Sequence, residues 1–213
     1  MFEKLRDPAS GLSHLVGALL SVVALVLLLH AAITQKSPWE IVAYSIFGVS
    51  MILLYSASTI YHLVSASEKV IIRLRKLDHA MIFVLIAGSY TPICLTPLRG
   101  KLGFILLATL WVTAISGIVF KMFFINAPRW FYTMVYIVMG WAAIFVIVPL
   151  YKAVGLSAII WLVTGGLFYT LGGIIYALKK PNFIPKWLGF HELFHILIIL
   201  GSASHFLMVY LYC

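Results

Sequence analysis

The chain has 213 residues, of which 63% are hydrophobic and 10% are charged, and its mean hydropathy is +1.09. Soluble domains are about 45–50% apolar and about 25% charged, so this composition excludes a surface that faces water over most of its area. The formal net charge is +9, but the basic residues do not form a domain outside the hydrophobic stretches. This distribution argues against nucleic-acid binding. We therefore expect an all-α polytopic membrane protein that forms a single domain over residues 1–213.

Seven stretches of the chain are long and apolar enough to cross a bilayer, which takes about 20 residues in a helix. In chain order they are residues 12–33, 39–63, 77–97, 102–123, 131–151, 156–178 and 190–212. The first stretch also resembles a cleaved signal peptide, but its length suits a span better. Loop residues separate the stretches, among them Lys36-Ser37-Pro38, the run from Glu68 to Lys76, and Lys179-Lys180-Pro181. The sequence therefore predicts a seven-transmembrane helix bundle.

Lysine and arginine are distributed unevenly between the two sides of this predicted bundle. The N-terminus and the second, fourth and sixth loops together carry 11 of them, whereas the other side carries 4. Because loops rich in lysine and arginine stay in the cytoplasm, we expect a cytoplasmic N-terminus and a C-terminus outside.

Several ionisable side chains nevertheless lie within or beside the predicted spans, where a charged group costs about 2.5–3.5 kcal/mol on insertion scales. In the predicted topology His62 ends the second span and Asp78 begins the third, while His191 and His195 begin the seventh. All four therefore lie near the cytoplasmic face. A lone histidine there is often interfacial, and an aspartate often caps a helix. Neither role explains why four such residues share one depth.

A zinc site explains this convergence. His191 and His195 are four residues apart, so they lie about 40° apart on one helical face and can bind one metal ion. His62 would supply a third nitrogen and leave the fourth position open for water, as in catalytic zinc sites. Asp78 would orient that water or accept its proton, and Ser58, one turn from His62, would donate a hydrogen bond.

Other polar residues accompany this set. His14 begins the first predicted span at the same depth, where it would join the outer shell of the site. Ser202 and His205 share the face of His191, but His205 lies about 21 Å farther along the helix. We therefore expect Ser202 and His205 to line a polar cavity or to pack against another span.

Glu192 completes the pattern His-Glu-x-x-His between His191 and His195. The pattern is typical of zinc proteases, in which the glutamate is the general base. Because it lies in the last predicted span, no later helix supplies a third ligand. An intramembrane metalloprotease is therefore a lesser alternative, and Glu192 would otherwise lie at the inner interface.

Spaced motifs extend from Ser13-His14 almost to the C-terminus. They are Ser58-x-x-x-His62, Ser67-Glu68-Lys69-Val70, Leu77-Asp78-His79, Ala87-Gly88-Ser89-Tyr90-Thr91-Pro92, His191-Glu192-Leu193-Phe194-His195 and Gly201-Ser202-x-x-His205-Phe206. Their identity and order resemble the hemolysin III family, the bacterial branch of the progestin and adipoQ receptors, which include the adiponectin receptors.

The resemblance implies a seven-helix bundle in a bacterial plasma membrane, with a cytoplasmic N-terminus. It also implies Zn²⁺ held by His62, His191 and His195, with Asp78 and Ser58 beside it. Adiponectin receptors are linked to ceramidase-type amide hydrolysis, and the bacterial members to membrane lysis and lipid homeostasis. The long cytoplasmic N-terminal region of the receptors has no counterpart here, so we do not expect hormone binding.

Two functions follow as hypotheses. The first is a zinc-dependent hydrolase of a lipid amide or ester, such as a ceramide-like amide, that reaches its substrate from within the bilayer. The second is a non-enzymatic membrane sensor or cytolysin in which zinc joins helices structurally. A fourth protein ligand would favour the structural site, because catalytic zinc keeps one position open. In both cases membrane lipids are the expected partners.

Overall fold

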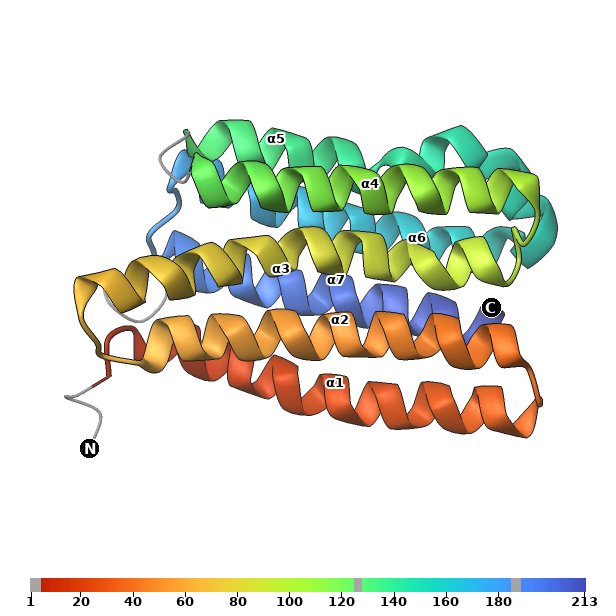
Figure 1. The fold of residues 1–213 in the computed structure, drawn as a ribbon, viewed down its shortest axis with the longest axis horizontal. Helices are drawn as coiled ribbons and strands as arrows, with labels where there is room; N and C mark the ends of the chain where they lie inside the picture. Colours follow the sequence, from red (N-terminus) through yellow and green to blue (C-terminus); the bar gives the residue numbers. More distant parts are fainter. Residues whose placement is uncertain (1–4, 125–127, 185–188) are drawn as a thin grey trace.

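The structure is a computed structural model, and it describes residues 5–124, 128–184 and 189–213. Its helices lie side by side with their long axes nearly parallel (Figure 1). They are α1 (Pro8–Thr34), α2 (Pro38–Leu63), α3 (Glu68–Leu95), α4 (Lys101–Phe123), α5 (Arg129–Gly140), the 3-10 helix η2 (Ala142–Val146), α6 (Ile147–Leu178) and α7 (Phe190–Tyr212). Lys4 and Lys186, which count toward the predicted cytoplasmic charge, lie outside the described residues.

Local sequence signals explain where the first helices begin. Pro8 and Pro38 each occupy the first turn of a helix, where the missing N–H of proline costs nothing. Ser37 caps α2, because its side chain accepts a hydrogen bond from the Glu40 amide at 3.4 Å. These starts agree with the predicted break between the first two spans.

Within the described residues, five helical segments are long and apolar enough to cross a membrane. They are Pro8–Thr34, Pro38–Leu63, Lys101–Phe123, Arg129–Leu178 and Phe190–Tyr212. The fourth has 50 residues and runs the length of the bundle, then reverses at the end opposite the N-terminus and returns as α6 (Figure 1). Gly155 marks the reversal with φ 80°, a value that glycine adopts without steric cost. The predicted stretches 131–151 and 156–178 are therefore the two limbs of this segment.

The predicted loop from Glu68 to Lys76 is wrong. These residues form the beginning of α3, which continues to Leu95 without a break. The basic residues keep this end of the helix out of an apolar phase, but lysine, arginine and leucine are all good helix formers. Charge therefore marks where the apolar part of α3 begins, not where the helix begins. The helix as a whole is less apolar than the five segments above.

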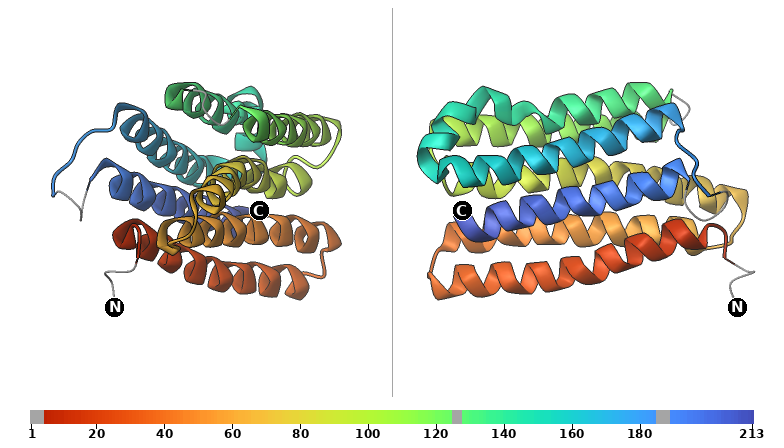
Figure 2. Two further views of the ribbon diagram at one scale, coloured as in Figure 1. Left: turned by 60° about the vertical axis from the view of Figure 1, so that its left-hand side comes forward. Right: turned by 180° about the vertical axis from the view of Figure 1, so that it is seen from behind.

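The remaining features of the fold place the start of α1 beside the last helix. In chain order, α1 packs along α2 and α2 along α3, while α7 packs along both α6 and α1. The two turned views show α7 between α6 and α1 (Figure 2). Buried aromatic side chains such as Tyr44, Phe47 and Phe83 fill the core. Residues that are far apart in sequence therefore meet at the end of the bundle where α1 and α7 begin and α2 ends.

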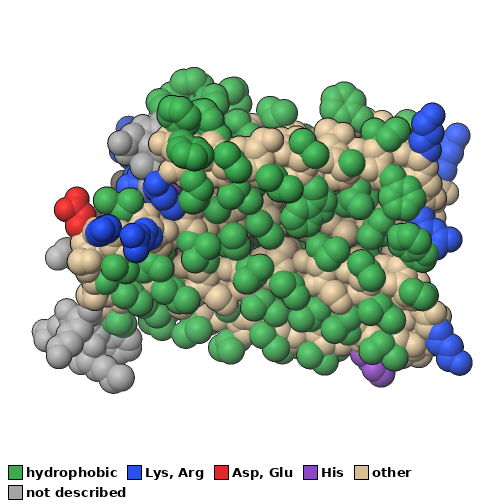
Figure 3. All heavy atoms as spheres, viewed as in Figure 1, with side chains coloured by type: hydrophobic (Ala, Val, Ile, Leu, Met, Phe, Trp, Pro, Cys, Tyr) green, Lys and Arg blue, Asp and Glu red, His purple; other side chains and the backbone are tan. Residues whose placement is uncertain are grey.

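The outer surface of the bundle is apolar along its middle. Hydrophobic side chains cover this band, and lysine and arginine gather at the two ends (Figure 3). Several large side chains are mostly exposed, among them Phe145 at 85% and Val112 at 63%. A water-soluble protein does not leave so continuous an apolar surface uncovered. The protein is an integral membrane protein with multiple apolar spans.

Candidate metal centre

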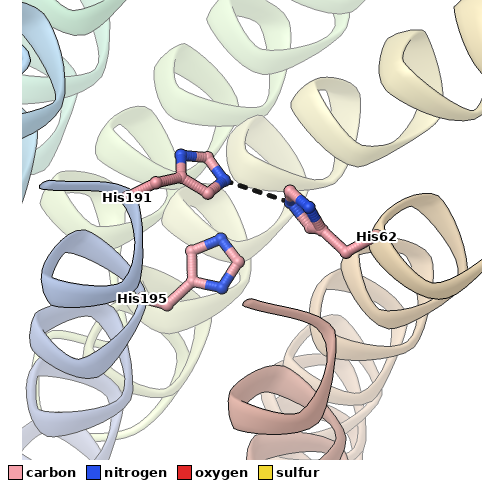
Figure 4. A group of neighbouring side chains, drawn as sticks. All are labelled: His62, His191 and His195. Atoms are coloured by element: carbon pink, nitrogen blue, oxygen red, sulfur yellow. Dashed lines mark hydrogen bonds between the residues drawn. The ribbon is translucent and has the colours of Figure 1, made fainter. Parts of the chain in front are cut away.

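Three histidines from two helices converge at the cytoplasmic end predicted from the charge distribution. His62 lies in the last turn of α2, and His191 and His195 lie in the first two turns of α7. One ring nitrogen from each lies within 4.8 Å of the other two, and the rings face a common point (Figure 4). His62 and His195 are 3% and 1% exposed. The cluster is therefore a buried group of possible metal ligands.

The hydrogen bonds around the cluster fit a metal site. Nδ1 of His195 lies 3.0 Å from the Ser10 carbonyl oxygen, and Nδ1 of His62 lies 3.3 Å from Asp7 Oδ2. Neither oxygen can donate, so the network assigns the proton to Nδ1 in both rings. This leaves Nε2 of each ring unprotonated, which is the state in which imidazole binds metal.

The spacing between the nitrogens of His62 and His191 is also suitable. Nε2 of His62 and Nε2 of His191 are 3.1 Å apart, whereas two nitrogens about 2.0–2.1 Å from one tetrahedral zinc ion are separated by about 3.3–3.4 Å. With its proton on Nδ1, His62 can accept a hydrogen bond from Nε2–H of His191 at its Nε2, and a metal ion would take the place of that proton. An all-imidazole set suits zinc, copper or nickel better than magnesium or calcium.

Asp78 and Ser58 line the same cavity as the histidines, but Asp78 does not belong to the group of possible metal ligands. Asp78 is 9% exposed, and its Oδ2 lies 4.0 Å from Nε2 of His79. Ser58 lies close to Asp78, and its buried hydroxyl makes no hydrogen bond of good geometry with any described residue. Both polar groups therefore lie side by side on the wall of the cavity.

Glu192 is engaged at both of its carboxylate oxygens. Oε2 accepts a hydrogen bond from the Gly189 amide at 2.9 Å, which caps the first turn of α7. Oε1 accepts a hydrogen bond from the Ser10 hydroxyl at 2.6 Å. A general base needs a free oxygen directed at the attacking water, so this arrangement favours a structural role for Glu192.

His14 stacks directly on a member of the cluster. Its ring is nearly parallel to that of His195, with 3.6 Å between the ring centres, and it meets the Tyr55 ring edge to face at 5.0 Å. Both of its ring nitrogens are buried without a hydrogen-bond partner among the described residues. His14 thus packs against His195 and is not part of the group of possible ligands.

Ser202 and His205 lie deeper along α7 and join it to other helices. The Tyr55 hydroxyl from α2 donates to Ser202 Oγ at 2.6 Å, and the Tyr169 hydroxyl from α6 lies 2.8 Å from the same atom. Nε2 of His205 lies 3.3 Å from the Leu162 carbonyl oxygen. His205 also lines the cavity.

A cavity of about 430 Å³ extends from the histidines into the bundle. Pockets for small molecules have volumes of about 300–1,000 Å³ and combine apolar walls with a few polar groups. The apolar part of the wall includes Leu85, Ile86, Ile137 and Ile198. Lys121 also lines it, with its ammonium 3.3 Å from the centre of the Tyr132 ring. The volume and lining suit an amphipathic molecule.

Sequence reasoning missed the contribution of Asp7 and Ser10, which join Ser13 in contacting the cluster. These residues precede or begin α1, and their side chains or carbonyl groups contact His62, His195 and Glu192. Nothing in their spacing distinguishes them from ordinary helix-start residues. Only the packing of α1 against α2 and α7 reveals these contacts.

Comparison with known proteins gives a consistent result over almost the whole chain. The family model described as "Haemolysin-III related" matches residues 2–206. A protein named "Hemolysin-3 homolog" from Bacillus subtilis (strain 168) is 42% identical over 213 residues, which cover 100% of this chain and 97% of the relative. "Hemolysin-3" from Bacillus cereus is 39% identical over 207 residues, which cover 97% and 91% of the two chains.

A more distant human relative is also similar. "Monocyte to macrophage differentiation factor" from Homo sapiens is 26% identical over 181 residues, which cover 82% of this chain and 71% of the relative. Both bacterial relatives are identical to this chain at more than a third of the aligned positions. Each alignment covers more than nine-tenths of both proteins. The chain therefore belongs to the haemolysin-III related family.

Proposed function

We propose that the protein is a zinc-dependent hydrolase of lipid amides or esters that acts within the membrane, in the manner of a ceramidase. The observation that carries this proposal is that His62, His191 and His195 adjoin a cavity that also contains Asp78. A metal-ligand group, a carboxylate and an apolar volume thus occur together at one end of the bundle. Metal-assisted hydrolysis of a lipid amide or ester would use all three.

The zinc ion, when bound, supplies polarisation of the substrate carbonyl and a lowered pKa for water. The protein's own residues then carry the proton. Asp78 accepts a proton from the water that attacks the carbonyl carbon, and it returns that proton to the leaving amine or alkoxide as the carbonyl–heteroatom bond breaks. Ser58 donates a hydrogen bond to the developing oxyanion.

The cavity wall orients the substrate. Its apolar side chains from α3, α5 and α7 would hold an acyl chain and exclude bulk water, while the polar end holds the headgroup near Asp78. Substrate would enter from the bilayer as a membrane lipid. The same proposal includes seven spans, with the 50-residue segment Arg129–Leu178 counted as two, α3 as one, and the N-terminus in the cytoplasm.

A structural zinc in a membrane sensor or cytolysin is the second candidate, favoured by the position of the histidines across α2 and α7. The curated bacterial relatives carry the name hemolysin. A structural site closes its fourth position with a protein ligand, and the described residues offer three possible ligands in this group. The open position therefore supports the enzyme. The protease alternative is weakened, because both Glu192 oxygens are engaged.

The test uses detergent-purified, zinc-loaded protein incubated with a panel of ceramides, acyl amides and phospholipids. Released fatty acid is measured by mass spectrometry. We expect turnover of at least one lipid class and its loss in Asp78→Asn, with zinc content unchanged. The absence of turnover in the whole panel, with stoichiometric zinc bound, would instead support the structural site.

A further inference from the structure

The segment from Asp7 to Ser13 lies against both helices that carry the histidine cluster. The Asp7 amide donates to the His62 carbonyl oxygen at 2.9 Å, and Asp7 Oδ2 accepts from Nδ1 of the same histidine at 3.3 Å. The backbone and the side chain of Asp7 therefore both contact His62, which is one of the possible metal ligands. Arg6 adds to this contact, because its Nε donates to Asp7 Oδ2 at 3.1 Å while its guanidinium lies 4.1 Å from the centre of the Tyr61 ring.

The next turn of the segment holds a ligand on α7. The Ser10 carbonyl oxygen accepts from Nδ1 of His195 at 3.0 Å, and Ser13 Oγ lies 3.2 Å from the same nitrogen. The Ser13 hydroxyl proton is directed at the Ser10 carbonyl oxygen, at 2.7 Å, so Ser13 Oγ can accept from the ring. The Ser10 hydroxyl also binds Glu192 at 2.6 Å, which joins α1 to the first turn of α7.

Close packing makes these contacts possible. Gly11 faces the end of α2, and a Cβ atom at this position would overlap the Leu63 side chain and lie 3.3 Å from His62 Cβ. The absence of a side chain at Gly11 thus allows α1 to approach the histidine-bearing end of α2. In this interface Ser10 is buried, and the Asp7 carboxylate is half-exposed at its rim.

We infer that Asp7 and Ser10 are positioning residues of the metal centre, which hold the Nδ1-protonated form and the ring orientation of His62 and His195. Oxygen acceptors on the nitrogen away from the metal raise the basicity of a histidine ligand, and their loss lowers metal affinity by about 10–100-fold. The inference rests on the proposed metal site but not on the proposed hydrolysis. It assigns the start of α1 to the centre, although α1 supplies no ligand.

The experiment measures zinc affinity in full-length, detergent-purified protein by competition with a chromophoric chelator. Asp7→Ala should weaken zinc binding about 10–100-fold. Asp7→Asn keeps an acceptor oxygen without charge, so its affinity should fall between those of Asp7→Ala and the wild type. Glu68→Gln is the matched control, because Glu68 is an exposed carboxylate at the start of α3, and its affinity should equal that of the wild type.

A second readout separates positioning from a structural role. Cobalt bound in place of zinc should show altered d–d absorption in Asp7→Ala, because His62 changes orientation, while the melting temperature of the metal-free protein stays near that of the wild type. Equal zinc affinity and identical cobalt spectra in all variants would overturn the inference. If the wild type itself binds no zinc, the proposed function fails instead. If Asp7→Ala does not fold, the isosteric Asp7→Asn carries the same comparison.

Discussion

Nε2 of His62 and Nε2 of His191 lie 3.1 Å apart, although 129 residues separate them in the sequence. The two rings come from the last turn of α2 and the first turn of α7. Two basic nitrogens this close share either a proton or a metal ion, because their lone pairs would otherwise repel each other. A measurement of metal content therefore tests directly whether this pair binds a metal ion.

The double variant His191→Ala/His195→Ala should lose bound zinc, because one imidazole cannot hold the ion alone. Metal content measured by inductively coupled plasma mass spectrometry should fall from near one ion per chain to background. His30→Ala is the control, since His30 is an exposed histidine of α1. Zinc retained in the double variant would show that the metal binds elsewhere.

Asp78→Asn should lower kcat for lipid hydrolysis by about 10²–10⁴-fold, the usual contribution of a general base. Because Asp78 is not in the group of possible ligands, zinc content should stay at the wild-type level. Initial rates against the best lipid of the panel provide the measurement, and Glu68→Gln should retain full activity. A loss of zinc together with activity would make Asp78 a ligand.

Glu192→Gln distinguishes the helix cap from a protease base. Loss of the charged cap should lower stability by about 0.5–2 kcal/mol, and activity should fall by about tenfold or less. Thermal unfolding and initial rates are measured on the same preparation. A decrease in activity of about 10³-fold or more at unchanged stability would show that Glu192 takes part in catalysis.

Ser202→Ala should destabilise the bundle, because the hydroxyl groups of Tyr55 and Tyr169 both meet Ser202 Oγ. The Tyr55 hydroxyl would keep its hydrogen bond to the Ile198 carbonyl oxygen at 3.2 Å, whereas loss of the Ser202 partner of the buried Tyr169 hydroxyl costs about 1–3 kcal/mol. Ser204→Ala is a suitable comparison, since Ser204 Oγ bonds only to the Leu200 carbonyl oxygen of its own helix among the described residues. The melting temperature should fall clearly in the first variant and little in the second.

Fusion of reporters to the C-terminus tests the proposed seven spans. With an odd number of spans and a cytoplasmic N-terminus, alkaline phosphatase fused after Cys213 should be active and a fluorescent protein in the same place dark. A fusion after Lys36 should behave in the same way, and a fusion after Lys69 should show the reverse. A fluorescent C-terminal fusion would mean an even number of spans or an inverted protein.

The sequence by itself determined the features that depend on local chemistry. Apolar runs of about 20 residues predict helices that lie in a membrane, and the four-residue spacing of His191 and His195 places both on one face of α7 whatever surrounds it. The family resemblance was confirmed by comparison with known proteins. The start of α3 was predicted incorrectly, because charge and helix propensity act independently.

Only the tertiary structure decided which groups meet across helices. The contact of Asp7 with His62, the stacking of His14 on His195, and the hydrogen bond from Ser10 to Glu192 all join residues from different helices. Spacing along one helix determines the direction of its side chains relative to each other. It does not determine the rotation of that helix against its neighbours, which follows from side-chain packing over the whole bundle, including the close approach at Gly11.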